Sequence, residues 1–262
     1  MRPIHELSST AARDIEFVLT DIDDTLTDRG YLGSEAYSAL WALHRAGLHV
    51  IPVTGRPAGW CDLIIREWPV DAVVGENGAF VYFRDGSAIR TMIHPSAAGG
   101  EIRTKLEEIR RAVLAEVPGS RVARDQFARL YDLAIDFRED PPELTLGDAQ
   151  RIKEICERFG AQAKISSIHV NTWFGSYDKV AMASIYLKEQ CALSDEGMKR
   201  RVMFCGDSPN DEPMFRFFPR SCAVANIGEY AEYLTTEPAF VSAAGHGEGF
   251  AEIVKVLLGK RG

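Results

Sequence analysis

Short apolar runs alternate with amphipathic segments along the first third of the chain. The runs have the length of strands, and the segments between them place apolar residues at helical spacing, as Ala36, Leu40 and Leu43 do. Ser34 is suited to cap the first helix and Gly47 to end it. Strands are therefore predicted at residues 15–20, 48–53 and 71–74, and helices at 34–47 and 57–67.

The pattern changes in the middle of the chain. Residues 84–100 are rich in Gly, Ser, Ala and Asp, which indicates a crossing into a second unit. Beyond this crossing, helices are predicted at 101–117 and 147–159, and strands at 130–137 and, as a pair, within 162–173. Such a segment is typical of a small α+β module inserted into the chain.

The alternation of strands and helices resumes after the insertion. Strands are predicted at 202–205, 222–225 and 240–243, and helices at 178–190, 209–217, 229–234 and 249–258. Alternating elements of this length predict an α/β fold with a doubly wound parallel sheet that is covered on both faces. The predicted division is a core domain of residues 1–83 and 178–262 and an inserted domain of residues 84–177.

The composition is that of a globular protein, and its charge argues against one class of partner. The 262 residues carry 30 Lys and Arg against 38 Asp and Glu, a net charge of −8, which argues against a general nucleic-acid binder. Five scattered cysteines favour reduced thiols over a disulfide framework. With no secretory signal and no run of membrane-spanning length in view, we expect a cytoplasmic protein without membrane contact.

Three aspartates follow the first predicted strand. Asp21, Asp23 and Asp24 lie in the segment TDIDDTLTD, and ligands of open parallel sheets bind at the carboxyl ends of strands. Carboxylates this close repel one another unless a cation neutralises them, and Mg²⁺ is the usual cation for carboxylate oxygens. Taken alone, the segment is equally well explained as a solvated acidic turn.

A second acidic turn, GDSPND at residues 206–211, follows another predicted strand. Asp207 and Asp211 would approach the same cation from a neighbouring strand end. Gly206 would allow a close backbone turn, and Asn210 would hydrogen-bond a ligand or brace the loop. One such segment can be a simple turn, but two acid-rich turns after apolar strands favour a shared metal site.

Two further positions suit a phosphate group. Thr54 and Gly55 lie in VTGRP, between a predicted strand and a predicted helix, where a hydroxyl and backbone N–H groups can hold phosphate oxygens. Lys179 begins the helix after the insertion and would neutralise both a phosphate and the carboxylate that attacks it. Each is weak alone, because the first can be a turn and the second a surface lysine.

Together these segments resemble the motifs of the haloacid dehalogenase-like (HAD) superfamily of phosphatases. DIDDT is similar to the D-x-D-x-T signature, Thr54 and Lys179 match the second and third motifs, and GDSPND the fourth, in the same order. The resemblance covers the whole chain and implies a Rossmann-like core. The position of the insertion is similar to that of the type IIB cap of Cof-type sugar phosphatases, sucrose-phosphate phosphatase and mannosyl-3-phosphoglycerate phosphatase.

Smaller segments support this subfamily, and two depart from it. ENGA at residues 76–79 and GHGEGF near the C-terminus are similar to the same group. The segment TGRP differs from the mannosylphosphoglycerate branch, which leaves the substrate open. Asp24 replaces the more usual Gly of the first motif without changing a catalytic carboxylate.

The resemblance implies a Mg²⁺-dependent phosphatase that acts on a small phosphorylated metabolite, a sugar phosphate or a phosphorylated sugar acid such as mannosyl-3-phosphoglycerate. Asp21 would be the nucleophile that forms an aspartyl-phosphate, and Asp23 the general acid and base. Thr54 and Lys179 complete the catalytic set, and Thr54, Gly55 and Asn210 would hold the phosphate. The implied metal ligands are Asp21, Asp23 through its backbone carbonyl, Asp207 and Asp211.

Substrate choice is expected to lie in the inserted domain. Arg124 is a candidate for a second anionic group of the substrate, and His169 and Asn171 lie near the strand that leads back to the core. A solvated arginine and ordinary core packing are the alternatives for these residues.

Two other functions stay open at this stage, a phosphosugar mutase and a non-catalytic phosphate-binding protein of the same fold. The related mutases have a longer, Gly-rich fourth motif. A non-catalytic relative typically lacks Asp21 or Asp23, and both are present. The expected assembly is a monomer or a homodimer.

Overall fold

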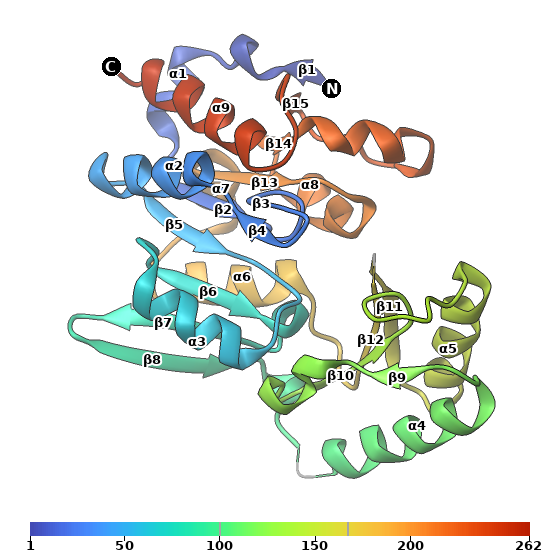
Figure 1. The fold of residues 1–262 in the computed structure, drawn as a ribbon. Coiled ribbons are helices and arrows are strands. Elements are labelled where there is room, and N and C mark those ends of the chain that lie inside the picture. Colours follow the sequence, from blue (N-terminus) through green and yellow to red (C-terminus); the bar gives the residue numbers. More distant parts are fainter. Residues whose placement is uncertain (100, 167) are drawn as a thin grey trace. The chain divides into compact units, whose positions relative to one another are not determined.

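The computed structural model describes residues 1–99, 101–166 and 168–262, which divide into two compact units (Figure 1). Unit 1 consists of Met1–Gly55, Cys61–Met92 and Asp178–Gly262. Unit 2 consists of Arg56–Trp60 and Ile93–Tyr177. Unit 2 therefore interrupts unit 1 in the sequence.

A six-stranded sheet forms the centre of unit 1, in the order β1-β15-β14-β13-β2-β5. Every neighbouring pair in it runs parallel. The α/β fold class predicted from the alternation of elements is therefore confirmed. The strands are β1 (Arg2–Pro3), β2 (Phe17–Thr20), β5 (His49–Pro52), β13 (Val202–Gly206), β14 (Ser221–Ala223) and β15 (Phe240–Val241).

Helices accompany this sheet, and α2 and α9 lie against each other (Figure 1). In the described parts of the chain, no helix combines the length and the apolar character needed to cross a membrane. The α-helices are α1 (Ser9–Asp14), α2 (Ser34–Arg45), α3 (Ala58–Glu67), α6 (Lys179–Glu189), α7 (Asp195–Arg201), α8 (Glu212–Phe217) and α9 (His246–Gly259). The 3-10 helices of unit 1 are η1 (Ile4–Glu6), η2 (Glu76–Gly78), η5 (Pro209–Asp211) and η6 (Ala225–Tyr233).

Alternate residues of the central strands serve the two faces of the sheet. Phe17 and Leu19 of β2 share one buried cluster with Met182 of α6 and Phe215 of α8. Val18, between them, points to the opposite face and is buried as well. Both faces therefore exclude water, which is why these strands appear in the sequence as short continuous apolar runs.

A second sheet of unit 1 follows β5 and contains β6 (Ala72–Gly75), β7 (Phe80–Asp85) and β8 (Ala88–Ile93). A parallel bridge between Val53 and Val74 connects β6 with the end of β5. The predicted domain boundary at residue 84 falls inside β7, and the compact unit extends to Met92 instead. The Gly- and Asp-rich composition belongs to a tight turn around Gly86, whose φ is +59°, and not to a linker.

Several short elements were not predicted because they lack a periodic apolar pattern. Two of them, the helices α1 and α7, have an N-cap: Ser8 accepts a hydrogen bond from the backbone N–H of Ala11, and Ser194 accepts one from that of Gly197. The unpredicted elements include α1, α7 and a small hairpin of β3 (Thr27–Asp28) and β4 (Tyr31–Leu32).

Unit 2 has a four-stranded sheet in the order β11-β12-β10-β9, and its neighbouring strands are antiparallel. On one face, Ile135 of β10 and Val170 of β12 pack with Ile109 of α4 and Ile152 of α5. The other face carries polar side chains, because strand residues alternate. The elements are α4 (Ile102–Glu116), α5 (Leu146–Arg158), β9 (Arg121–Val122), β10 (Asp132–Asp136), β11 (Gln162–Ile165), β12 (His169–Trp173), η3 (Pro95–Ala97) and η4 (Arg124–Ala128).

A pH-sensitive pair lies at the start of β5. Nδ1 of His49 is 3.2 Å from Oδ1 of Asp71, and the other Asp71 oxygen accepts a hydrogen bond from the Val50 N–H at 2.9 Å. The hydrogen bond with Asp71 raises the pKa of His49; the charge of Glu16 also raises it, while partial burial and the charge of Arg201 oppose the shift. The folded state therefore favours the protonated ring.

The sign of the resulting stability effect follows from linkage. The contribution of His49 is fully present below the pKa of an unfolded histidine and is lost as the pH rises through the raised pKa of the folded state. We expect Asp71→Asn to lower the His49 pKa toward its ordinary value of 6.5. An NMR titration of the His49 ring checks this against the unmodified protein, and an unchanged midpoint would contradict it.

Candidate active site

The two acidic turns singled out in the sequence lie close together because the strands before them are neighbours. Asp21 directly follows β2, and Asp207 directly follows β13, which pairs with β2 in parallel. The backbone N–H of Asp21 donates to the carbonyl of Cys205 at 2.9 Å. Residues far apart in the sequence therefore share the carboxyl edge of the sheet, where open α/β folds bind ligands.

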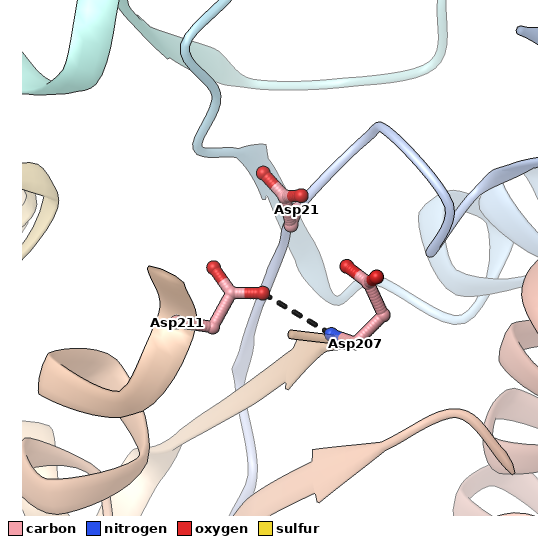
Figure 2. A group of neighbouring side chains, drawn as sticks. All are labelled: Asp21, Asp207 and Asp211. Atoms are coloured by element: carbon pink, nitrogen blue, oxygen red, sulfur yellow. Dashed lines mark hydrogen bonds between the residues drawn. The ribbon is translucent and has the colours of Figure 1, made fainter. Parts of the chain in front are cut away.

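Three carboxylates form a buried cluster at this edge. One oxygen each from Asp21, Asp207 and Asp211 lies within 4.8 Å of the other two, and all three side chains are buried. Figure 2 shows them facing a common space from the ends of β2 and β13 and from the turn after β13. A set of oxygen donors this close fits a hard divalent cation.

Lys179 is the only lysine or arginine that forms ion pairs with this cluster among the described residues. Its Nζ lies 2.8 Å from Oδ1 of Asp21 and 2.8 Å from Oδ1 of Asp211, and it donates to Oδ1 of Asn210 at 3.2 Å. The side chain is 7% exposed, so these contacts replace water. One ammonium group faces three carboxylates, which leaves the site short of positive charge.

Burial and the short distances between these charges also shift the pKa values of the cluster. Burial raises the pKa of the Asp21 carboxyl to about 7, although Lys179 opposes the shift and Asp211 adds to it. Burial and repulsion from Asp211 and Asp21 raise the pKa of Asp207 to about 9. Burial disfavours the charged form of Lys179, but Asp21 and Asp211 outweigh it and raise its pKa. The protein alone does not balance the negative charge here, which fits a bound cation.

Two glycines allow the backbone to place these side chains. A Cβ on Gly206 would lie 2.4 Å from Oδ2 of Asp211, the oxygen that accepts a hydrogen bond from the Asp207 N–H at 3.1 Å. Gly78 has a φ of +107°, and a Cβ there would lie 2.1 Å from the carbonyl oxygen of Asp178. Asp178 caps the helix that Lys179 begins, so the close packing of the ENGA turn against Asp178 helps to fix the position of that lysine.

The remaining core candidates lie around the cluster in different ways. Thr54 directly follows the Val53 bridge at the end of β5 and is fully buried, and its N–H donates to the carbonyl of Val74 at 2.9 Å. Asp23 is exposed, and its carboxylate is not one of the three that cluster. Thr25 donates to Oδ1 of Asp207 at 3.1 Å.

The candidates in unit 2 have partners of their own. Nε of Arg124 lies 2.5 Å from a carboxylate oxygen of Asp140. His169 is buried, with its Nε2 2.9 Å from an oxygen of Glu139. Asn171 shares the polar face of β12 with His169, and its side-chain oxygen is buried without a hydrogen-bond partner in the described parts of the chain.

One residue of the site was missed in the sequence. Asn226 lies just after β14, and its side-chain amide donates to Oδ2 of Asp207 at 3.4 Å and to the carbonyl of Asp24 at 3.1 Å. The signal that would find it is the one used for the acids, a polar residue at the carboxyl end of a parallel strand. This signal does not single out Asn226, because the sequence does not reveal that β14 lies beside β13.

Comparisons with known proteins identify related sequences. A family model described as haloacid dehalogenase-like hydrolase matches residues 18–120. A curated relative, named phosphoglycolate phosphatase, from Methanothermobacter thermautotrophicus is 28% identical over 253 residues, which cover 92% of this chain and 98% of the relative.

Solved structures share the fold at lower identity. A Thermoplasma acidophilum protein has a TM-score of 0.71 and 23% identity, with 93% of this chain and 98% of the other covered. The sucrose-phosphatase of Synechocystis, solved with sucrose and phosphate, has a TM-score of 0.64 and 15% identity, with 94% and 98% covered. At these identities the likeness concerns the fold alone.

Proposed function

The chain belongs to the haloacid dehalogenase-like hydrolases and is a phosphatase enzyme, and from this premise we propose that it hydrolyses a small phosphorylated metabolite with Mg²⁺ at the carboxylate cluster. The observation that carries the proposal is the contact of Lys179 with Asp21 in a buried cluster that also contains Asp207 and Asp211. Such a site combines a nucleophile with the positive charge that phosphoryl transfer needs.

The donor set supports Mg²⁺ as the cofactor. Asp21, Asp207 and Asp211 offer carboxylate oxygens, and the backbone carbonyl of Asp23 is proposed as a further ligand. When bound there, Mg²⁺ supplies positive charge that offsets the negative charge of the phosphoryl oxygens. The raised pKa values of Asp21 and Asp207 support the same assignment, since burial without a cation disfavours their charged forms.

In the first step, a carboxylate oxygen of Asp21 attacks the phosphorus atom, and the bond from phosphorus to the leaving oxygen breaks. The product on the enzyme is an aspartyl-phosphate. Asp23 donates a proton to the leaving oxygen, which departs as an alcohol. Lys179 lies 2.8 Å from Oδ1 of Asp21 and holds the nucleophile in place while stabilising the charge that builds up around it.

In the second step, a water molecule attacks the phosphorus atom of the aspartyl-phosphate. Asp23, now a carboxylate, accepts a proton from that water. The bond between phosphorus and Asp21 breaks, inorganic phosphate leaves, and the Asp21 carboxylate is regenerated. The hydroxyl of Thr54, the backbone of Gly55 and the amide of Asn210 are proposed to hold the phosphate oxygens through both steps.

The substrate class is proposed from the relatives and the resemblance together. The sugar phosphates and phosphorylated sugar acids implied by the type IIB motifs stay the first candidates. The relative named phosphoglycolate phosphatase adds phosphoglycolate, a phosphorylated acid, as a specific second candidate. Arg124, His169 and Asn171 are proposed to select the leaving group, and the unpartnered oxygen of Asn171 supports its inclusion.

A substrate panel with and without metal tests this function. We expect the purified protein to release phosphate from p-nitrophenyl phosphate with Mg²⁺, to lose this activity in EDTA, and to recover it when excess Mg²⁺ is restored. Phosphoglycolate, sugar phosphates, phosphorylated sugar acids and nucleotides, compared by kcat/KM, then identify the class.

Three results would count against the proposal. Equal activity in EDTA would exclude the metal site. Absence of hydrolysis on every compound would favour a non-catalytic phosphate-binding protein. Transfer of phosphate within a sugar, dependent on a bisphosphorylated activator, would identify a mutase.

A further inference from the structure

Three segments of unit 1 meet at the side chain of Asn226, the second residue of η6. Its Oδ1 accepts a hydrogen bond from the backbone N–H of His246 at 2.9 Å, at the start of α9. Its Nδ2 donates to the carbonyl of Asp24 at 3.1 Å and to Oδ2 of Asp207 at 3.4 Å. Because an N–H faces the amide oxygen, the NH₂ group must face the two acceptors, and the orientation of the amide is fixed.

The Asp207 carboxylate is held from both sides as a result. Thr25 donates to Oδ1 at 3.1 Å, and Asn226 reaches Oδ2. Neither partner belongs to the acidic cluster. A carboxylate torsion is otherwise broad, so these two bonds define the direction in which the Asp207 oxygens point.

The same amide holds backbone in an uncommon conformation. Asp24 has a φ of +58° and His246 a φ of +50°, both in the left-handed region. The Asp24 carbonyl oxygen, which accepts from Asn226, also lies 3.2 Å from Nδ1 of His246. Since Asp24 immediately precedes Thr25, the contact of Asn226 with Asp24 also fixes the second partner of Asp207.

We propose that Asn226 is a positioning residue for the metal site, which orients Asp207 directly and through the loop of Asp24 and Thr25. The inference rests on the proposed function, in which Asp207 is a Mg²⁺ ligand. Side chains that orient metal ligands typically account for about 10- to 100-fold in metal affinity when they are removed. In this proposal Asn226 acts through Asp207 and the loop of Asp24 and Thr25, and not as a ligand of the metal.

The test is direct titration of Mg²⁺ into the 262-residue chain by calorimetry. We expect Asn226→Ala to weaken Mg²⁺ binding, which raises the dissociation constant by about 10- to 100-fold. With p-nitrophenyl phosphate, the Mg²⁺ concentration for half-maximal rate should rise by the same factor, while kcat at saturating Mg²⁺ stays within a few fold. Asn226→Ser, whose hydroxyl is too short to span the gap to Asp207, is the second variant if the alanine variant does not fold.

A matched control separates positioning from loop stability. The Ser242 hydroxyl donates to the Ala244 carbonyl at 2.7 Å, in the loop whose Ala244 oxygen also accepts from the Ala225 N–H. Ser242→Ala should therefore lower the melting temperature without changing Mg²⁺ affinity. Unchanged affinity in a folded Asn226 variant would overturn the inference, whereas failure of the unmodified protein to bind Mg²⁺ would instead overturn the proposed function.

Discussion

Asp21→Asn is expected to lower kcat by roughly 10⁴-fold or more, because an amide does not attack phosphorus as a carboxylate does. The fold should survive. The asparagine keeps an oxygen for the 2.8 Å contact with Lys179 and removes one charge from a buried cluster in which Asp21 and Asp211 repel each other. Phosphate release with p-nitrophenyl phosphate and Mg²⁺ measures the loss, and thermal unfolding of the same sample checks the fold.

The control for this substitution is an aspartate with the same chemistry and no place in the cluster. Asp62 lies on α3, is half exposed and forms an ion pair with Arg66 four residues later. Asp62→Asn should keep the activity of the unmodified protein. Activity within tenfold of the unmodified protein in a folded Asp21→Asn variant would exclude Asp21 as the nucleophile.

Lys179→Met is expected to give the second largest effect. It removes the only ammonium that touches the described part of the cluster, at 2.8 Å from both Asp21 and Asp211. Removing one charge-stabilising donor from a buried site typically lowers kcat on the order of 10² to 10³-fold. Breaking a buried ion pair from one side also costs about 3 to 5 kcal/mol of unfolding free energy.

Two measurements separate these consequences. Urea unfolding without metal should show the loss of stability, and added Mg²⁺ should restore part of it, because the cation replaces some of the missing positive charge. Lys188→Met, on the same helix but half exposed and paired with Asp195, should change stability by less than about 1 kcal/mol. A Lys179→Met enzyme with unchanged kcat would contradict the proposed role.

The core of the fold was predictable because parallel strands that are buried on both faces appear in the sequence as short apolar runs. β2, β5 and β13 appear as apolar runs, and each is followed by the polar residues of the site. Strand β8 was not predicted, for the opposite reason. Most residues of β8 are exposed, so neither alternation nor an apolar run marks it. The turn at Gly86 is the available signal, but a Gly- and Asp-rich segment is also typical of a linker.

The site was predictable as a set of residues but not as a geometry. The positions of Asp21, Asp207 and Lys179 follow from strand ends and a helix start, and the structure brings them together. The sequence does not give the sheet order, and for that reason Asn226 was missed. It also does not give side-chain directions, so it could not separate the exposed Asp23 carboxylate from the buried cluster.

The most direct test is to identify the residue that carries the phosphoryl group during turnover. The enzyme is mixed with p-nitrophenyl phosphate and Mg²⁺, quenched in acid, and treated with borohydride, which reduces an acyl phosphate to an alcohol. We expect peptide mass spectrometry to find homoserine in place of Asp21, dependent on both substrate and Mg²⁺. Reduction at a different aspartate, or no reduction in a sample that is turning over with an observed burst of p-nitrophenol, would contradict the mechanism.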